Sequence, residues 1–253
     1  MDYPISPCSL LPPFIGEEER SSDRAANSDG KVPDPRNPGR FLLCRTRYLH
    51  TAADRRPHEL RIDRIGRLRK VQSGDLFDTM GMYPAVRGLD EDRRAGRAIY
   101  TLGLDRTLYA GCATTLGIGV RQFVDVRKAP ASSVTNALYL PDVIEFCHHS
   151  TFVGGADVLC AGELETNREG YLTYVSNWSG HYQPAKENLL YLVALLAERG
   201  VDLTSVIGGV VTGGGSSRYP AADWLAAGGD GVDSLPEGRE RADVISLFSG
   251  MVE

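Results

Sequence analysis

Short apolar segments separated by turn residues dominate the second half of this 253-residue chain and restrict the folds open to it. Strand-length runs are predicted at 98–102, 107–110, 143–151, 158–165, 171–176 and 206–211. Turns at 103–106 and 166–170 predict two antiparallel hairpins among these runs. One long amphipathic helix is predicted at 184–199, because Pro184 suits a first helical position and Gly200 a C-terminal stop. A mainly antiparallel sheet with a few helices indicates the α+β class.

Proline and charge divide the rest of the chain. Residues 1–39 hold seven of the 14 prolines among Ser, Asp, Glu and Arg. Such a segment buries too little apolar surface to offset its ordering entropy, so we predict a disordered leader, where a bacterial secretion signal would lie. Residues 40–95 are predicted to be a small, partly helical accessory region, and residues 96–253 the main domain. The helical prediction rests on four apolar residues at helical spacing: Leu60, Ile62, Ile65 and Leu68.

A basic island lies between acidic neighbours. Residues 40–70 carry 10 basic and 3 acidic groups, although the whole chain has a net charge of −5. Two interpretations are open: a solvated helical face, or a docking surface for an acidic partner. Phe41 and Tyr48 are the island's only aromatic residues, which gives no support to nucleic-acid binding.

The cysteine pattern and the length of the apolar runs indicate in which cellular compartment the protein works. The five cysteines are odd in number and include no Cys-x-x-Cys spacing, which disfavours a disulfide framework or a zinc site and favours a reducing compartment. The longest apolar run, Leu189–Ala197, is about half the length that a membrane-spanning helix needs. No secretory signal peptide is recognised at the N-terminus. We therefore expect a soluble protein that works in a cytosol.

Residues suited to chemistry concentrate in 147–182. The pattern comprises Cys147-His148-His149-Ser150-Thr151-Phe152, then Ala161-Gly162-Glu163-Leu164-Glu165, then Ser176-Asn177-Trp178-Ser179-Gly180-His181-Tyr182. Because alternate side chains of a strand share a face, Glu163 and Glu165 are predicted to project together. They are either two surface carboxylates or a pair that lines a cleft.

Within these three motifs, the order of 149–152, 161–164 and 176–182, followed by Pro184, resembles the CteC-type ADP-ribosyltransferases, bacterial effectors similar in fold to poly(ADP-ribose) polymerases. The resemblance covers about 98–206. It implies a sheet of ADP-ribosyltransferase type and an enzyme that transfers ADP-ribose from NAD to a threonine of host ubiquitin. It also implies a bacterial virulence factor, or toxin, secreted into the host cytosol by a type III system. In this interpretation 96–253 is the catalytic domain, and 40–95 binds the protein substrate.

The resemblance also implies an Asp–Glu catalytic pair. Glu163 matches the glutamate of this pair. Asp105 is the preferred aspartate, and Asp142 and Asp157 are alternatives. Each of the three aspartates could equally be an ordinary turn residue. Glu163 would stabilise positive charge on the ribose as the nicotinamide bond breaks, and the aspartate would act as general base.

Four residues are assigned to NAD binding: His149, Ser150, Thr151 and Tyr182. His149 and Ser150 would hold the nicotinamide end, and Tyr182 would stack on an aromatic ring. A buried histidine bonded to backbone, or a core tyrosine, is an equally good interpretation of these residue types.

Two other functions are open. A cysteine protease acting on ubiquitin conjugates would pair His181 with Cys112 or Cys147, and a non-catalytic binding module would use the basic island. A metal site is not expected, because neighbouring residues of a strand point to opposite faces. The Gly-rich segment 208–217 lacks the spacing of a phosphate-binding loop, so we expect a flexible loop at 212–217.

Overall fold

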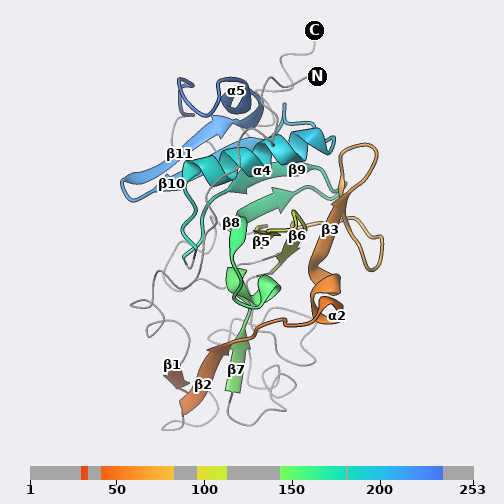
Figure 1. The fold of residues 1–253 in the computed structure, drawn as a ribbon, viewed down its shortest axis with the longest axis vertical. Helices are drawn as coiled ribbons and strands as arrows, with labels where there is room; N and C mark the ends of the chain where they lie inside the picture. Colours follow the sequence, from red (N-terminus) through yellow and green to blue (C-terminus); the bar gives the residue numbers. More distant parts are fainter. Residues whose placement is uncertain (1–29, 34–40, 83–95, 113–142, 181, 236–253) are drawn as a thin grey trace.

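The computed structural model describes residues 30–33, 41–82, 96–112, 143–180 and 182–235. An eight-stranded sheet with the order β11-β10-β9-β8-β5-β6-β3-β4 forms its centre (Figure 1). Its strands are β3 (Glu59–Ile62), β4 (Leu68–Lys70), β5 (Ala98–Gly103), β6 (Leu108–Gly111), β8 (Val158–Thr166), β9 (Leu172–Ser176), β10 (Ile207–Thr212) and β11 (Gly215–Pro220). Neighbouring strands are antiparallel except β9 and β10, which are parallel. Whether this sheet is of the ADP-ribosyltransferase type stays a prediction.

A smaller sheet has the order β1-β2-β7, from β1 (Gly30–Pro33), β2 (Phe41–Thr46) and β7 (Val143–Phe146). The helical elements are α2 (Ala52–Arg55), α4 (Lys186–Glu198), α5 (Ala221–Ala226) and the 3-10 helices η3 (Arg56–His58) and η6 (His149–Val153). No helix in the described part of the chain is both long and apolar enough to cross a membrane.

Two apolar cores lie on the faces of the central strands, because successive side chains of β5 and β8 point to opposite sides. On one face Tyr100, Leu102 and Leu164 belong to the larger core together with α4, which lies along the sheet in Figure 1. On the other face Ile99 and Ala161 belong to the smaller core, with residues of η6 and with Tyr182. Every residue of β5 and β8 is buried. The central strands therefore hold both cores together.

Local sequence signals gave the central elements. The predicted hairpins are confirmed by the β5–β6 and β8–β9 pairings, and the predicted helix is confirmed as α4. Its start lies at Lys186 rather than Pro184, since Ala185 is the N-cap and its N–H donates to the Asn188 side chain at 3.0 Å. Gly200 stops the helix with a φ of 92°, a conformation that favours glycine.

The predicted helix around 60–68 is wrong: this segment is the β3–β4 hairpin. Apolar residues two and three positions apart suit a strand and a turn as well as a helix. Asp63 closes the turn by accepting hydrogen bonds from the backbone N–H groups of Ile65 and Arg67. Gly66 has a φ of 81°, which ends any helix there. Residues 40–95 thus contribute two strands to the same sheet as 98–220.

Two further expectations are corrected. The strand predicted at 143–151 is shorter, since β7 ends at Phe146 and residues 149–153 form η6. The loop expected at 212–217 is largely the β10–β11 hairpin, and Trp224 in α5 is buried. Most of the predicted leader, 1–29 and 34–39, lies outside the described residues.

Candidate functional site

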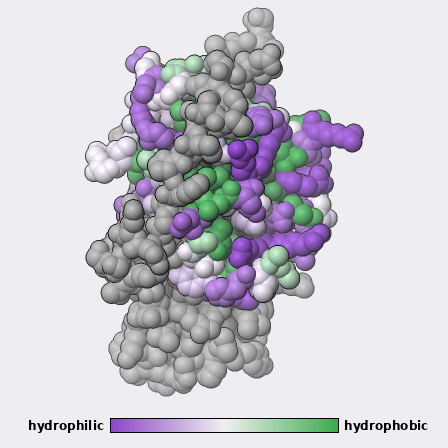
Figure 2. Space-filling view, viewed as in Figure 1, coloured by the Kyte–Doolittle hydropathy of each residue, from purple (hydrophilic) through white to green (hydrophobic). Residues whose placement is uncertain are grey.

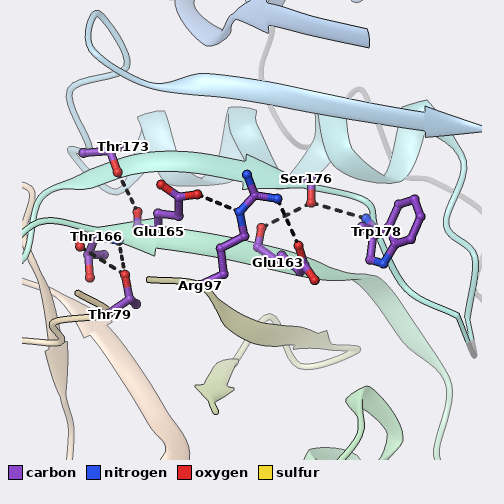
Figure 3. Close-up of polar contacts among 8 residues, drawn as sticks. All are labelled: Thr79, Arg97, Glu163, Glu165, Thr166, Thr173, Ser176 and Trp178. Carbon is purple, nitrogen blue, oxygen red and sulfur yellow. Dashed lines mark hydrogen bonds and ion pairs between the residues drawn. The ribbon is translucent and has the colours of Figure 1, made fainter. Parts of the chain in front are cut away.

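Two acidic side chains of β8 converge on one arginine (Figure 3). Arg97 Nη1 lies 3.3 Å from Glu163 Oε2, and Arg97 Nε lies 2.6 Å from Glu165 Oε1. The arginine precedes β5, which is paired with β8 so that Ile99 faces Glu163. Its guanidinium carbon also lies 4.3 Å from the ring centroid of Tyr174 on β9. The prediction that Glu163 and Glu165 share a face of β8 is therefore confirmed, and the cationic side chain of Arg97 lies between their carboxylates.

This cluster is buried. Glu163 is 2% exposed, and the Arg97 side chain is mostly covered. Taking charges out of water costs several kcal/mol per ion unless a partner offsets it, so Arg97 is what allows two carboxylates on one strand. The arrangement fixes the carboxylates as hydrogen-bond acceptors toward Arg97. In this structure the three side chains form an ion-pair network with a structural role.

The first two motifs meet at η6 and β8. A ring nitrogen of His149, Nε2, lies 3.0 Å from the Gly162 carbonyl oxygen, and Thr101 Oγ1 donates to the His149 carbonyl at 2.8 Å. Thr151 Oγ1 accepts from the His148 backbone N–H at 2.9 Å. Ser150 is buried, and its Oγ has no hydrogen-bond partner in the described part of the chain. His149 and Thr151 thus secure η6 through these backbone contacts.

The third motif joins strand ends. The Asn177 side chain accepts from the Val211 N–H at 2.6 Å and donates to the carbonyls of Val211 and Pro184 at 3.0 and 2.6 Å. Tyr182 is fully buried, and its hydroxyl donates to the Ala156 carbonyl at 2.8 Å. No local signal in the sequence identifies this role of Asn177, because its partner Val211 is 34 residues away. His181 lies outside the described residues.

The predicted catalytic aspartate is not close to Glu163. Asp105 lies in the β5–β6 turn, where its carboxylate accepts from the N–H and Oγ1 of Thr107 at 3.0 and 2.9 Å. Glu163 pairs with Ile99, four residues before Gly103 on β5, which corresponds to about 13 Å along a strand. Asp157 is exposed, and Asp142 lies outside the described residues. The structure therefore brings Glu163 together with Glu165 and Arg97 instead.

The surroundings of Cys147 and Cys160 do not favour a role as a catalytic nucleophile. Burial raises the pKa of the Cys147 thiol to about 12, and burial raises that of Cys160 to about 12 as well. A thiol with so high a pKa is a poor nucleophile at neutral pH. Among the described residues, no three His, Cys, Asp or Glu side chains gather where they could hold a metal ion.

A separate basic surface lies on the β3–β4 hairpin, which we define by Arg61, Arg64, Arg67 and Arg69. Asp63 neutralises part of it, since its Oδ2 lies 3.0 Å from Arg67 Nε and 2.8 Å from Arg69 Nε. The hydrogen bond from Arg69 holds the pKa of Asp63 well below its usual range.

The other two arginines of the basic surface are exposed, and neither has an ion pair with a described residue. Arg61 also faces Arg69 directly across the hairpin, a like-charge pair that costs stability. In Figure 2, hydrophilic residues cover much of the side where Figure 1 shows β3.

Comparisons with known proteins concern one segment of the chain. A family model described as the IQ motif-containing protein middle domain matches residues 133–189. The chain is 40% identical to the IQ domain-containing proteins IQM1 and IQM4 of Arabidopsis thaliana, and 41% identical to IQM2. Each match covers 58 residues, which is 23% of this chain and 12%, 11% and 9% of the relatives. No solved structure matches the chain.

These matches correct the sequence interpretation. The family-model match covers all three motifs, and the relatives are plant IQ domain-containing proteins rather than bacterial effectors. The identification as a CteC-type effector that modifies ubiquitin is therefore wrong, and so are secretion into a host cell and the toxin function. Residues that hold a fold together do not by themselves specify a reaction, because one fold can host many functions. Enzymatic activity and NAD as co-substrate stay predictions from the sequence.

Proposed function

We propose that this chain is a non-catalytic protein-binding module whose basic surface holds an acidic protein. The observation that carries the proposal is the exposure of Arg61 and Arg64 on a paired hairpin that has little local negative charge to meet them. Exposed positive charges attract an acidic partner and raise its association rate. The similarity of 133–189 to IQ domain-containing proteins supports a binding role over a catalytic one.

Calmodulin is the first partner to test. IQ motifs bind calmodulin, whose Ca²⁺-binding loops are rich in carboxylates. This chain contains no Ile-Gln dipeptide. Binding would therefore use the folded basic surface rather than a single basic helix, and it would persist only while the β3–β4 hairpin is intact.

Titration calorimetry with Ca²⁺-free calmodulin tests the proposal. We expect the affinity to fall as salt rises, because exposed ion pairs are screened. Arg64→Glu should weaken binding about tenfold, the size of an effect of about 1.4 kcal/mol. Arg218→Glu, on β11 at the opposite edge of the sheet, makes the same change in net charge and should leave binding nearly unchanged. Equal losses in the two variants, or no binding by the wild type, would refute a specific basic surface.

A further inference from the structure

The chain leaves α5 through a glycine-rich turn at 228–231 that contains an exposed Asp-Gly pair. Asp230 directly precedes Gly231, and the Asp230 side chain is 79% exposed. Gly231 has a φ of 73°, and an added Cβ there would meet no atom within 4 Å. Both residues of the pair are therefore accessible to water.

The backbone nitrogen of Gly231 is available for reaction. Among the described residues, none accepts a hydrogen bond from the Gly231 N–H. Glycine also has no side chain that could shield this nitrogen from the carboxyl group of the preceding residue. In any Asp-Gly pair, a bond from this nitrogen to the side-chain carboxyl carbon of the aspartate closes a five-membered ring. The turn thus presents an amide nitrogen without a protein partner next to an exposed carboxyl group.

Hydrogen bonds anchor the chain on both sides of the pair. Before it, the Gly229 carbonyl accepts from Trp224 Nε1 at 2.8 Å, and the Gly229 N–H donates to the Trp224 carbonyl at 2.9 Å. After it, the Leu235 N–H donates to the Arg218 carbonyl at 2.7 Å. A chemical change of the backbone at 230–231 would therefore alter a surface turn and leave the packing of α5 in place.

One contact opposes such a change. Lys186 Nζ donates to Asp230 Oδ1 at 2.5 Å, which joins the turn to the first residue of α4. The same hydrogen bond raises the pKa of Lys186, so its ammonium group stays charged at neutral pH. The carboxylate has to leave this cation before its carbon meets the Gly231 nitrogen. Because both partners are exposed, the contact slows the reaction by a small factor and does not prevent it.

We propose that Asp230-Gly231 is a site of spontaneous isoaspartate formation, which Lys186 restrains. The Gly231 nitrogen attacks the side-chain carboxyl carbon of Asp230, a C–N bond forms, and the carboxyl hydroxyl leaves with the nitrogen proton as water. A second water then opens the cyclic imide. Attack at the side-chain carbonyl restores aspartate. Attack at the backbone carbonyl breaks the original peptide bond and leaves the chain linked through the side-chain carboxyl carbon.

The product changes the turn in a defined way. Isoaspartate adds one methylene to the backbone, and its free carboxylate is attached directly to Cα. The carboxylate therefore reaches one methylene less far than that of Asp230, so the contact with Lys186 is lost. An isoaspartate methyltransferase with labelled S-adenosylmethionine detects the product, because it methylates isoaspartate and leaves L-aspartate unmodified.

Ageing of the full chain at neutral pH, followed by methyltransferase labelling and peptide mapping, tests the proposal. We expect the 230–231 peptide to appear first in a form lighter by one water and then as isoaspartate, ahead of Asp233-Ser234 in the same segment. Lys186→Ala should raise the rate about two- to fivefold, whereas Lys186→Arg keeps the cation and should leave the rate nearly unchanged. Asp230→Glu is the blocked control, because it keeps the negative charge but would have to close a six-membered ring.

Each outcome decides the proposal. Isoaspartate at 230 that forms in the wild type, forms faster in Lys186→Ala and is absent from Asp230→Glu supports it. Equal rates in the wild type and Lys186→Ala overturn the restraint by Lys186. Product at 230 in urea but none in the folded chain overturns the site itself, because the fold would then protect the turn. Thermal unfolding checks that all variants are folded.

Discussion

Gly162 and Ser176 lie so close together across β8 and β9 that a Cβ on the glycine would overlap the serine carbonyl oxygen. The same oxygen accepts a hydrogen bond from the Tyr100 hydroxyl at 2.8 Å, which fixes it in place. Burial raises the pKa of Tyr100 well above its usual range, so this hydroxyl stays a donor. The glycine of the second motif is thus required by a backbone contact.

Gly162→Ala is expected to destabilise the protein by about 3 kcal/mol or more, since neither backbone nor Tyr100 can retreat without breaking contacts in the larger core. Urea unfolding followed by circular dichroism measures it. Gly180→Ala is the matched control, because an added Cβ there meets no atom within 4 Å. Similar stability of the two variants would contradict the close approach.

Replacing Arg97 with methionine should cost about 3–5 kcal/mol, because it leaves two carboxylates of β8 without their cation. The double variant Arg97→Met/Glu163→Gln should recover part of the loss, since it removes the charge of one carboxylate that Arg97 pairs with. Chemical unfolding of the two variants and of Glu163→Gln alone gives the coupling energy directly. A coupling energy near zero would show that the ion pair is not formed.

Asn177→Asp tests the bridge between strand ends. Aspartate has nearly the same shape but cannot donate to the carbonyls of Val211 and Pro184, so both would lose a partner. We expect a loss of about 2–3 kcal/mol, the cost of leaving buried polar groups unsatisfied. Hydrogen exchange should rise first at the end of β10, because the side-chain bond to the Val211 carbonyl is lost there while the backbone pairing of β9 and β10 remains. Unchanged exchange there, with an unchanged midpoint of unfolding, would count against the bridge.

Sequence patterns gave the elements whose signals are local. The two central hairpins have clear turn residues between alternating or apolar runs, and α4 has an apolar stripe and a glycine stop. The segment 60–68 is predicted as a helix but forms a hairpin. Its apolar spacing also fits two short strands when Asp63 closes the turn between them. The close approach of Gly66 to Gly200 is a tertiary contact, which the local apolar pattern does not reveal.

Only part of the candidate site can be predicted from the sequence. The common face of Glu163 and Glu165 follows from strand alternation, but Arg97 lies 66 and 68 residues away along the chain. A buried pair of acids demands a cation, although nothing local says which one supplies it. The assignment of His149 and Tyr182 to cofactor binding stays a prediction, and the structure shows both side chains bonded to backbone carbonyls, as their residue types also allow.

Arg106→Gly should stabilise the protein by about 0.5–1 kcal/mol, because glycine adopts the left-handed conformation without strain. The same substitution removes the guanidinium, whose carbon lies 6.0 Å from the ring centroid of Tyr191, and this loss opposes the gain. Arg106→Asn, which also tolerates this conformation, separates the backbone effect from the loss of the longer side chain. Thermal unfolding measures both variants, and a glycine variant that melts below the wild type would contradict a dominant backbone strain.

Alkylation of the thiols tests the buried cysteines and the protease alternative together. With its pKa raised to about 12 by burial, Cys147 is almost wholly protonated at pH 8, and its side chain is also shielded from reagent. Iodoacetamide should therefore label Cys112, which is partly exposed, long before Cys147 or Cys160. Peptide mapping by mass spectrometry at increasing times gives the rates. In urea all three should react alike, because unfolding restores an ordinary thiol pKa; fast labelling of Cys147 in the folded protein would instead point to an activated nucleophile.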